Sequence, residues 1–401
     1  MRVVFVNHCH PDTPHVCATR MREFASALSC LGHEVILLTE VLEGRPSVTP
    51  AIGSHNFSAP LYVATNPTGH SSISALRKRT LPWGIRQAVV IWHYLKYKGV
   101  FTDWRSGTQA VLPTIAEQFK PDLVWASFGN TDCWNVAKDL AQLAGCPWVA
   151  DLKDLWTNFI PVPLQKHLSH HFSDCAAITT FSNFHSIDAE MFFDAVPTPI
   201  YSGFSKNALR PNSVGEASKI TISLTGAIYD KTALKKLIRG VEIWQSTKEA
   251  ELQFIYAGHD IAEVKAATAE LSKCCKVDIK GYLPLEELRE IQRNAAANLY
   301  IKSDHTFHHK TIEMLSVGRP IICFPGETGE AIEIARTTGV PLHSCSSPHE
   351  IATALEQSLN FATIDVTKNT GILGLTWQAQ AKKLEQVFQD VLNQAGEKSH
   401  V

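Results

Sequence analysis

The amino-acid sequence predicts an α/β protein with two doubly wound parallel-sheet domains. Short apolar runs alternate with segments of helical periodicity along the whole chain, a rhythm typical of parallel sheets covered by helices. The alternation is interrupted by a polar stretch at 210–216 and then restarts. At roughly 150 residues per domain, 401 residues allow two to three domains. We therefore expect domains at 1–205 and 216–375, and a last helix at about 376–394 that packs back on the first.

The predicted strands are short apolar runs without polar alternation, as expected for strands buried on both faces. Met21, Phe24 and Leu28 share one face of a predicted helix that Gly32 ends. Residues 40–75 are rich in Ser, Pro, Thr and Gly, and we interpret them as loops. Strands are expected at 3–7, 34–39, 123–127, 148–152, 177–182 and 199–202, and then at 220–225, 252–257, 277–280, 297–302 and 320–324.

Composition excludes several classes of protein. With 45% apolar and 19% charged residues, the chain is typical of a globular protein. The net charge of −2 argues against a general nucleic-acid binder. No apolar run approaches the roughly 20 residues that span a bilayer, and the N-terminus predicts a strand rather than a signal peptide. We expect a cytoplasmic protein whose ten cysteines are reduced and mostly structural.

The usual phosphate-binding and hydrolase motifs are absent, so chemistry is sought in the loops that follow the strands. After the strand at 297–302, a polar loop leads to a helix that opens with His308, His309 and Lys310. Cations at this end oppose the helix dipole, and a bound diphosphate would relieve that penalty. Glu313, one turn on, could accept hydrogen bonds from ribose hydroxyls or could merely complement the dipole.

A second loop, after the strand at 220–225, repeats this pattern. Gly226 permits close backbone approach, and Lys231 opens the next helix. Lys231 could face an anion or could be an ordinary surface lysine. Gly258 and Gly281 end two further strands in the same way and could flank a base.

Together these loops resemble the second domain of retaining glycosyltransferases of the GT-B fold, sequence family four. The first domain is similar to that family in its opening strand, loop and helix and in residues 32–35. Residues 150–156 (ADLKDLW) resemble the "DLRDxW" segment of members that build bacterial surface polysaccharides, and 181–183 and 201–204 lie where the family has two turns. The resemblance implies two domains facing a cleft, with the nucleotide sugar bound by the second.

On the donor side, the resemblance implies roles for single residues. Lys231 and Lys310 would bind the diphosphate, with the backbone N–H of Thr311, and Glu313 would hold the ribose as the second acid of the family's E-x7-E element. The base would be bordered by three residues: Gly258, Gly281 and Tyr282.

On the acceptor side, Asp151, Lys153 and Asp154 would lie near the transferred sugar and acceptor, with Arg20 at the head of the first helix. The sequence departs from the family at two places. His305 stands where the first acid of E-x7-E is expected, which leaves the sugar open. The first loop lacks the family's glycine pair and carries instead a histidine-rich segment in which His8 and His10 could touch substrate or could be plain loop side chains.

Three alternatives compete with this reading. A metal site could use His8, Cys9, His10, Asp12, His15 and Cys17, or His305, His308 and His309, but neither cluster has a standard zinc spacing, so we predict no metal and no cofactor. Another GT-B activity, such as a sugar-nucleotide epimerase or a phosphorylase, is the second alternative. The third is a non-catalytic nucleotide-sugar-binding subunit.

Residues 76–105 suggest a membrane surface. This segment contains seven basic residues and one acidic residue, Asp103, which gives a net charge of +6. Six aromatic residues are interleaved with them. Such a segment suits a helix on an anionic membrane, as a lipid-linked acceptor would require. A helix packed on the first domain with solvated cations is the alternative. The basic residues are Arg77, Lys78, Arg79, Arg86, Lys96, Lys98 and Arg105, and the aromatic ones are Trp83, Trp92, Tyr94, Tyr97, Phe101 and Trp104.

The sequence thus predicts a glycosyltransferase that moves a sugar from a nucleoside diphosphate sugar to a hydroxyl of a glycan or lipid-linked acceptor. Retention of configuration follows from the resemblance alone. The expected partners are the donor, the acceptor and an anionic membrane surface at which the protein is peripheral, and not nucleic acid. The base, the sugar, the acceptor, the linkage and the oligomeric state stay open.

Overall fold

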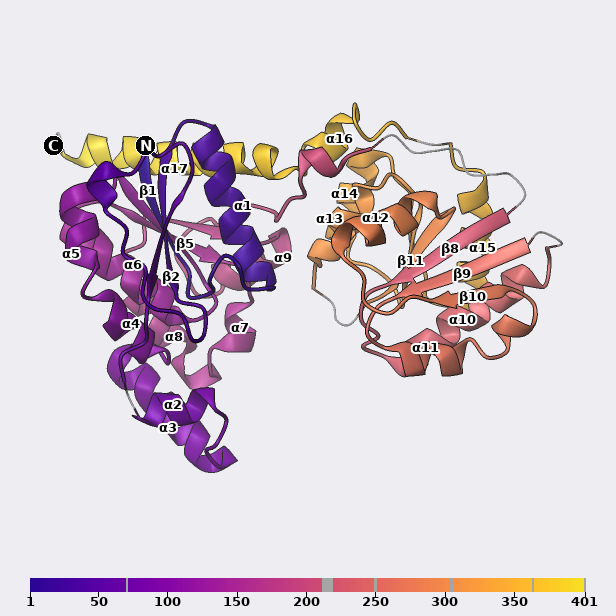
Figure 1. Ribbon diagram of the computed structural model, residues 1–401, viewed down its shortest axis with the longest axis horizontal. Helices are drawn as coiled ribbons and strands as arrows, with labels where there is room; N and C mark the ends of the chain where they lie inside the picture. The colour runs from indigo at the N-terminus through magenta and orange to yellow at the C-terminus, as the bar shows by residue number, and fades with distance from the viewer. Residues whose placement is uncertain (70, 211–218, 249–250, 303–305, 363, 400–401) are drawn as a thin grey trace. The chain divides into compact units, whose positions relative to one another are not determined.

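The computed structural model divides into two compact units, Met1–Ser202 with Trp377–Val401, and Gly203–Thr376 (Figure 1). It describes residues 1–69, 71–210, 219–248, 251–302, 306–362 and 364–399. The predicted linker at 210–216 lies mostly outside these residues. The chain leaves the first unit at Ser202, ahead of that linker, and returns to it at Trp377.

The first unit is built on a seven-stranded, all-parallel sheet of order β3-β2-β1-β4-β5-β6-β7. Its central strands follow the predicted apolar runs closely, since these are buried on both faces. The strands are β1 (Arg2–Val6), β2 (Glu34–Glu40), β3 (Leu61–Thr65), β4 (Leu123–Ser127), β5 (Trp148–Leu152), β6 (Ala177–Thr180) and β7 (Thr198–Pro199).

Helices cover both faces of this sheet. The α-helices are α1 (Val16–Cys30), α2 (Ser71–Arg77), α3 (Trp83–Tyr97), α4 (Thr102–Thr108), α5 (Leu112–Thr114), α6 (Thr131–Ala144), α7 (Trp156–Phe159), α8 (Gln165–His171), α9 (Asn183–Glu190) and α17 (Trp377–Ser399). Short turns of other helix types are η1 (Ile52–Ser54), η2 (Ile115–Phe119) and η3 (Val162–Leu164). Among the described residues, no helix is long and apolar enough to cross a membrane.

Alternate residues of β1 feed two separate cores, because successive side chains of a strand point to opposite faces. Val4 and Val6 join a core with α6, whereas Val3 and Phe5 join a core with α1 and α17. α17 supplies Trp377, Ala381, Leu384, Phe388 and Val391 to this second core. The C-terminal helix is therefore part of the first unit's hydrophobic core.

The second unit holds a six-stranded, all-parallel sheet of order β10-β9-β8-β11-β12-β13. The strands are β8 (Lys219–Thr225), β9 (Glu251–Ala257), β10 (Lys276–Ile279), β11 (Ala297–Ile301), β12 (Ile321–Phe324) and β13 (Leu342–Ser344). The helices are α10 (Lys231–Gln245), α11 (Ile261–Ala267), α12 (Leu285–Asn294), α13 (His309–Leu315), α14 (Gly329–Thr338), α15 (Pro348–Leu359) and α16 (Thr370–Leu373), with short turns η4 (Lys206–Ala208) and η5 (Leu271–Lys273).

Two parallel sheets with helices on their faces confirm the predicted fold class. Three details of the prediction are wrong. Residues 40–75, interpreted as loops, contain η1, the edge strand β3 and most of α2. The strand expected at 199–202 is only Thr198–Pro199, an edge strand where Pro is tolerated, although the Ile200 N–H still donates to the Thr180 carbonyl at 2.8 Å. β13, an edge strand of three residues, was not predicted.

Candidate functional site

The loops at the carboxyl ends of β8, β9 and β10 lie side by side. The Gly226 N–H donates to the Ala257 carbonyl at 2.9 Å, and the Gly258 N–H donates to the Gly281 carbonyl at 2.9 Å. Gly226 has φ +94° and Gly281 φ +71°, backbone conformations that favour glycine. A Cβ on Gly258 would lie 2.3 Å from the Tyr256 hydroxyl. The predicted glycines therefore lie together at the carboxyl edge of the sheet, where ligands of parallel sheets bind, with Gly226 half-buried and Gly258 and Gly281 buried.

Lys310 reaches this edge from α13, whose N-cap is His308. Its Nζ donates to the Thr225 carbonyl and lies 2.7 Å from the place where a Cβ of Gly226 would stand. The ammonium group also sits 5.1 Å from the centre of the Tyr300 ring. Burial lowers the pKa of Lys310 to about 8, and the nearby Glu313 carboxylate offsets this effect only in part. Within the described ranges, no acid forms an ion pair with Lys310.

Glu313 lies one turn along α13 and is about one third exposed. Its Oε1 is 3.5 Å from His309 Nε2. Burial raises the pKa of Glu313, but the hydrogen bond from His309 and the positive charges of His309, Arg289 and Lys310 outweigh burial, so the net pKa lies below its usual value. Glu313 is therefore an ionised acceptor close to a cation, as the predicted ribose contact requires.

Lys231 opens α10 as predicted, after the N-cap Asp230. Its side chain is 73% exposed and pairs with Glu263 at 3.0 Å. An exposed pair of this kind is worth little, so Lys231 can be redirected to a ligand at small cost. Thr311 is less available, because its N–H already donates to the His308 carbonyl at 3.1 Å and its side chain is buried.

A buried hydrogen-bond and ion-pair network holds the Tyr300 ring that contacts Lys310. The sequence did not indicate this network. The Tyr300 hydroxyl donates to Glu327 Oε1 at 2.8 Å, and Lys302 Nζ pairs with Glu327 Oε2 at 2.8 Å. Both charged side chains are almost fully buried. Glu327 follows the cis bond Phe324-Pro325 in a loop that carries no recognisable motif, so only the structure connects it to the site.

An exposed aromatic pair lies beside Gly281. The rings of His259 and Tyr282 stack, with centroids 4.8 Å apart and planes 12° from parallel. Tyr282 is 71% exposed. Tyr282 was predicted to border a base, whereas His259 was not recognised. His305, the departure from the family pattern, lies outside the described residues.

Two predicted residues of the first unit form a buried ion pair. Arg20 contacts Asp151 through Nε–Oδ2 at 3.2 Å and Nη2–Oδ1 at 2.8 Å. Ser127 and Thr179 each donate to Asp151 at 2.9 Å, and neither member of the pair is more than 1% exposed. The pair joins α1 to β5. Contact of Arg20 or Asp151 with substrate stays a prediction, which this burial disfavours.

Lys153 and Asp154 follow β5 and pair with each other. Burial lowers the pKa of Lys153, but the negative charges of Cys17 and Asp154 outweigh it and raise the pKa. Burial raises the pKa of Asp154 in spite of Lys153. Both residues therefore lie with Cys17 at the carboxyl end of the first sheet, where the prediction placed a site.

His8 and His10 occupy the loop after β1. His8 stacks on Phe101 at 5.7 Å, and burial lowers the pKa of His8 to about 4, so its imidazole is neutral at pH 7. Its ring lies so close to Gly129 that a Cβ there would be 2.6 Å away. His10 Nδ1 accepts the Asp12 N–H at 3.2 Å. These contacts show how the protein holds both rings and leave their substrate contacts as predictions.

Similarity to known proteins is visible in the fold but not in the sequence. No family model matches the chain, and no curated protein matches its sequence. Sucrose-phosphate synthase from Thermosynechococcus elongatus superposes with TM-score 0.64 at 13% identity, over 98% of this chain and 99% of that one. A glycosyltransferase from Rickettsia africae has TM-score 0.61 at 13% identity, over 98% of each chain.

A third similar structure was solved with a nucleotide sugar. Anabaena HepE in complex with UDP-glucose has TM-score 0.56 at 12% identity, over 99% of this chain and 100% of that one. At such low identities the comparison shows the fold. The chain therefore has the two-domain GT-B architecture that the sequence predicts.

Proposed function

We propose that the protein is a glycosyltransferase that takes its sugar from a nucleoside diphosphate sugar. The observation that supports this most is Lys310, a largely enclosed ammonium group without an acidic partner in the described sequence, held against the Gly226 backbone. An anion at this place would replace the missing counter-charge. The structural likeness to sucrose-phosphate synthase, and to HepE solved with UDP-glucose, supports the same proposal.

The chemistry needed is stabilisation of a departing diphosphate. When the bond between the sugar's anomeric carbon and the diphosphate oxygen breaks, negative charge grows on the leaving group. Lys310 would face that charge, and Lys231 would join after leaving Glu263. Lys310, held in place by the Thr225 carbonyl, would lower the barrier electrostatically as a preorganised cation.

The nucleoside would be held by the neighbouring groups of the second unit. Glu313 would accept from the ribose hydroxyls, and the stacked pair of His259 and Tyr282 offers an aromatic face to a base. Gly258 and Gly281 would border the base; at Gly258 the Tyr256 hydroxyl and the Gly226 carbonyl already occupy the place of a Cβ. Lys153 and Asp154, in the first unit, would meet the acceptor and the transferred sugar. Retention of configuration, and a glycan or lipid-linked acceptor, rest on the family resemblance.

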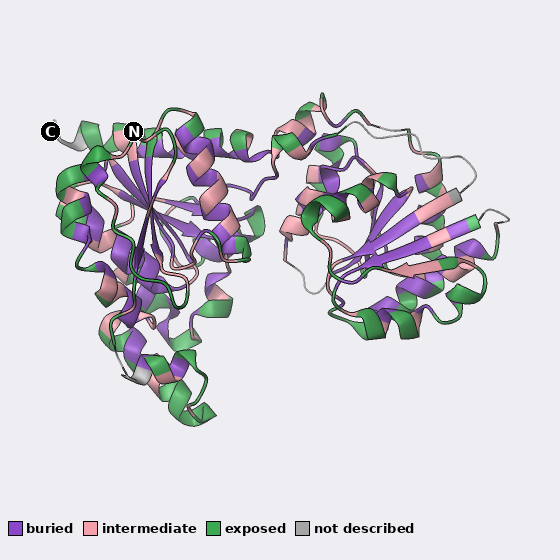
Figure 2. Cartoon of the chain, in the orientation of Figure 1, coloured by how far each residue is buried: buried purple, intermediate pink, exposed green. Residues whose placement is uncertain are grey.

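A peripheral membrane contact through α3 is part of this proposal. Trp83 is 78% exposed and Trp92 49%, with Ile85, Ile91 and Leu95 also exposed on the same helix, which Figure 2 shows largely in green. Exposed tryptophans beside cations are typical of interfacial helices. α3 would therefore touch a lipid surface.

A cationic pocket borders α3 and supports an anionic partner there. The cavity, of ≈ 500 Å³, is lined by Lys96, Lys98, Arg105 and His171 among others. Burial, followed by the charges of Lys138, Lys98 and Arg105, lowers the pKa of His171 to about 4. His171 is therefore neutral at pH 7, and Arg105 is paired with Asp139 at 3.0 Å. Lys96 and Lys98 supply the positive charge of the lining, which a lipid phosphate would fit.

The proposal is tested by release of nucleoside diphosphate from a panel of UDP-, GDP- and ADP-sugars, followed by NMR. Transferases hydrolyse their donor slowly without acceptor, so one sugar nucleotide should release its diphosphate. Lys310→Ala should slow release by about 100-fold or more, as loss of one preorganised charge stabiliser does. Lys265→Ala, on α11, is the matched control and should change nothing. Failure of every donor, or an unchanged rate in Lys310→Ala, would overturn the proposal.

A further inference from the structure

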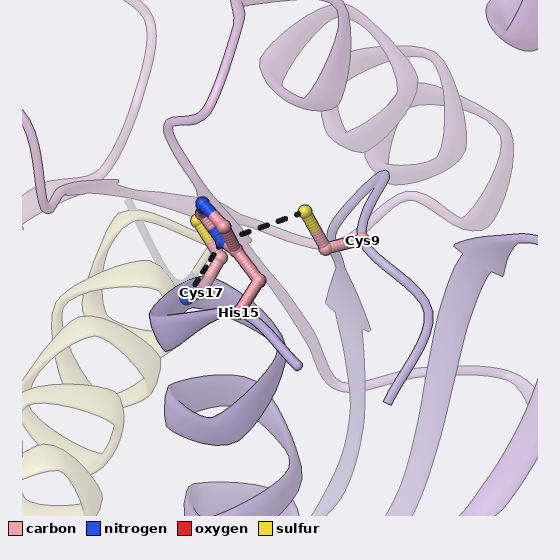
Figure 3. A group of neighbouring side chains, drawn as sticks. All are labelled: Cys9, His15 and Cys17. Carbon is pink, nitrogen blue, oxygen red and sulfur yellow. Dashed lines mark hydrogen bonds between the residues drawn. The ribbon is translucent and has the colours of Figure 1, made fainter. Parts of the chain in front are cut away.

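We propose that Cys9, His15 and Cys17 form a binding site for a thiophilic divalent cation, best represented by Zn²⁺. One ligand atom from each residue lies within 4.8 Å of the other two (Figure 3). This site goes beyond the proposed function and does not depend on it. It lies at the carboxyl end of β1, in the unit that does not carry Lys310.

The three side chains come from a loop and a helix start that are already tied together. The Cys9 N–H donates to Asn7 Oδ1 at 3.2 Å, and Asn7 Nδ2 donates to the Cys17 carbonyl at 3.3 Å. His15 is the N-cap of α1, and its Nδ1 accepts the Cys17 N–H at 3.2 Å. Because buried Asn7 holds both cysteines, the cluster needs little rearrangement to receive an ion.

The ligand atoms, all within 4.8 Å of one another, stand somewhat wider than those of a tetrahedral zinc site. With Zn–S about 2.3 Å and Zn–N about 2.0 Å, neighbouring ligand atoms stand roughly 3.5–3.8 Å apart. Cys9 Sγ and His15 Nδ1 are 4.0 Å apart. Closing this gap takes a side-chain rotation, after which the ion replaces the Cys17 N–H as the partner of Nδ1.

The donor set selects the type of ion. Two thiolates and an imidazole suit Zn²⁺ and its spectroscopic substitute Co²⁺, whereas Mg²⁺ and Ca²⁺ prefer oxygen ligands. All ten cysteines are free of disulfides, so both sulfurs can coordinate an ion. The ion would take the place of the contact between Cys9 Sγ and His8 Nε2 at 3.5 Å and of the hydrogen bond between Cys17 and Lys153. Three protein ligands leave one position of the tetrahedron open, the arrangement of zinc sites that bind an outside group. The spacing of these residues along the sequence gave no zinc motif, because the structure brings them together from both sides of a turn.

Cobalt titration of the full-length protein, kept reduced, tests this site. We expect one Co²⁺ per chain, a thiolate-to-cobalt charge-transfer band, and displacement by Zn²⁺. Cys9→Ser and Cys17→Ser should each weaken binding by on the order of 100-fold and diminish the band. Cys30→Ser removes an exposed thiol at the far end of α1 and should change neither.

Two results would overturn the site. One is the absence of a charge-transfer band when a thiol assay shows all ten cysteines reduced. The other is a band that persists at full strength in Cys9→Ser. Because Cys17 is buried, Cys17→Ser could unfold, and circular dichroism will show this. Cys9, half-buried in a loop, then decides the result. None of these measurements involves nucleotide, so failure here would leave the proposed transferase activity untouched.

Discussion

At the scale of single residues, the sequence located charged groups better than it located their partners. Lys310 and Glu313 were singled out because they lie at the start of a helix after a strand; Lys310 contacts the strand-end edge, whereas Glu313 contacts His309 on the same helix. The support from Tyr300 and Glu327 was invisible, since these residues come from different strands and loops. Arg20 and Asp151 were read as site residues, although they satisfy each other in the interior.

Lys310 gives the proposed site a pH dependence. Burial lowers its pKa to about 8 in the free protein, and a bound diphosphate would favour the charged form and raise that pKa. Binding above pH 8 must then take up a proton. We predict that the Kd for UDP rises up to about tenfold per pH unit above pH 8.

Calorimetry from pH 7 to 9, in two buffers of different ionisation enthalpy, measures both the Kd and the proton uptake. Lys310→Arg is the control, because a guanidinium stays charged over this range and should remove the pH dependence. A Kd for wild type that stays constant from pH 7 to 9 would show that Lys310 does not bind the diphosphate.

The buried ion pair of Arg20 and Asp151 should matter for stability. Asp151→Asn leaves the Arg20 guanidinium buried without its counter-charge, which costs about 3–5 kcal/mol of the free energy of unfolding. Asp122→Asn breaks the half-exposed pair with Arg2 and should cost at most about 1 kcal/mol. Urea unfolding of both variants gives the comparison. An equal loss in the free energy of unfolding for the two variants would contradict a larger contribution from the buried pair.

At the scale of elements, apolar runs predicted the central strands, whereas the edges escaped. Central strands are buried on both faces, so their composition is distinctive. β3 and β13 are short strands at sheet edges, and β3 lies among Ser- and Pro-rich segments. α12 shows a second limit. Its buried residues are Arg289 and Gln292, which no apolar pattern could indicate.

The segment 76–105 was correctly read as basic and aromatic, yet not all its cations face solvent. Arg77 pairs with Glu40 at 3.0 Å and Asp103 at 2.8 Å, so it holds α2 to the sheet unit. A charge reversal at Arg77 would therefore test folding and not lipid binding. The exposed tryptophans of α3 are the better target.

We predict that Trp83→Ala combined with Trp92→Ala weakens binding to phosphatidylglycerol vesicles by about tenfold or more, because burial of each large apolar side chain contributes roughly 1.5–3 kcal/mol. Binding should also weaken as salt is added. Vesicle sedimentation measures both effects. Leu143→Ala removes an exposed apolar residue of α6 and should have no effect. Equal binding of wild type and the double variant would refute a membrane role for α3.

At the scale of the whole molecule, the two units divide the proposed chemistry between them. The donor groups, Lys231, Lys310 and Glu313, belong to Gly203–Thr376, and Lys153 and Asp154 belong to Met1–Ser202. The predicted two-sheet architecture is correct because it depends on a repeated rhythm and not on any single residue. The identity of the substrate depends on single side chains at the strand ends. No repeated pattern in the sequence indicates it.

The central claim, a nucleoside diphosphate site in the second unit, is tested most directly by calorimetric titration with UDP, GDP, ADP and CMP in EDTA. One diphosphate should bind at about micromolar Kd, corresponding to about −8 kcal/mol. Glu313→Ala should weaken it by ~1–3 kcal/mol through loss of a charged hydrogen bond. Glu270→Ala, which removes an exposed acid paired with Lys273 at the start of η5, should leave it unchanged. If no diphosphate bound the wild type, or if Glu313→Ala bound equally well, the assignment of the donor site would be contradicted.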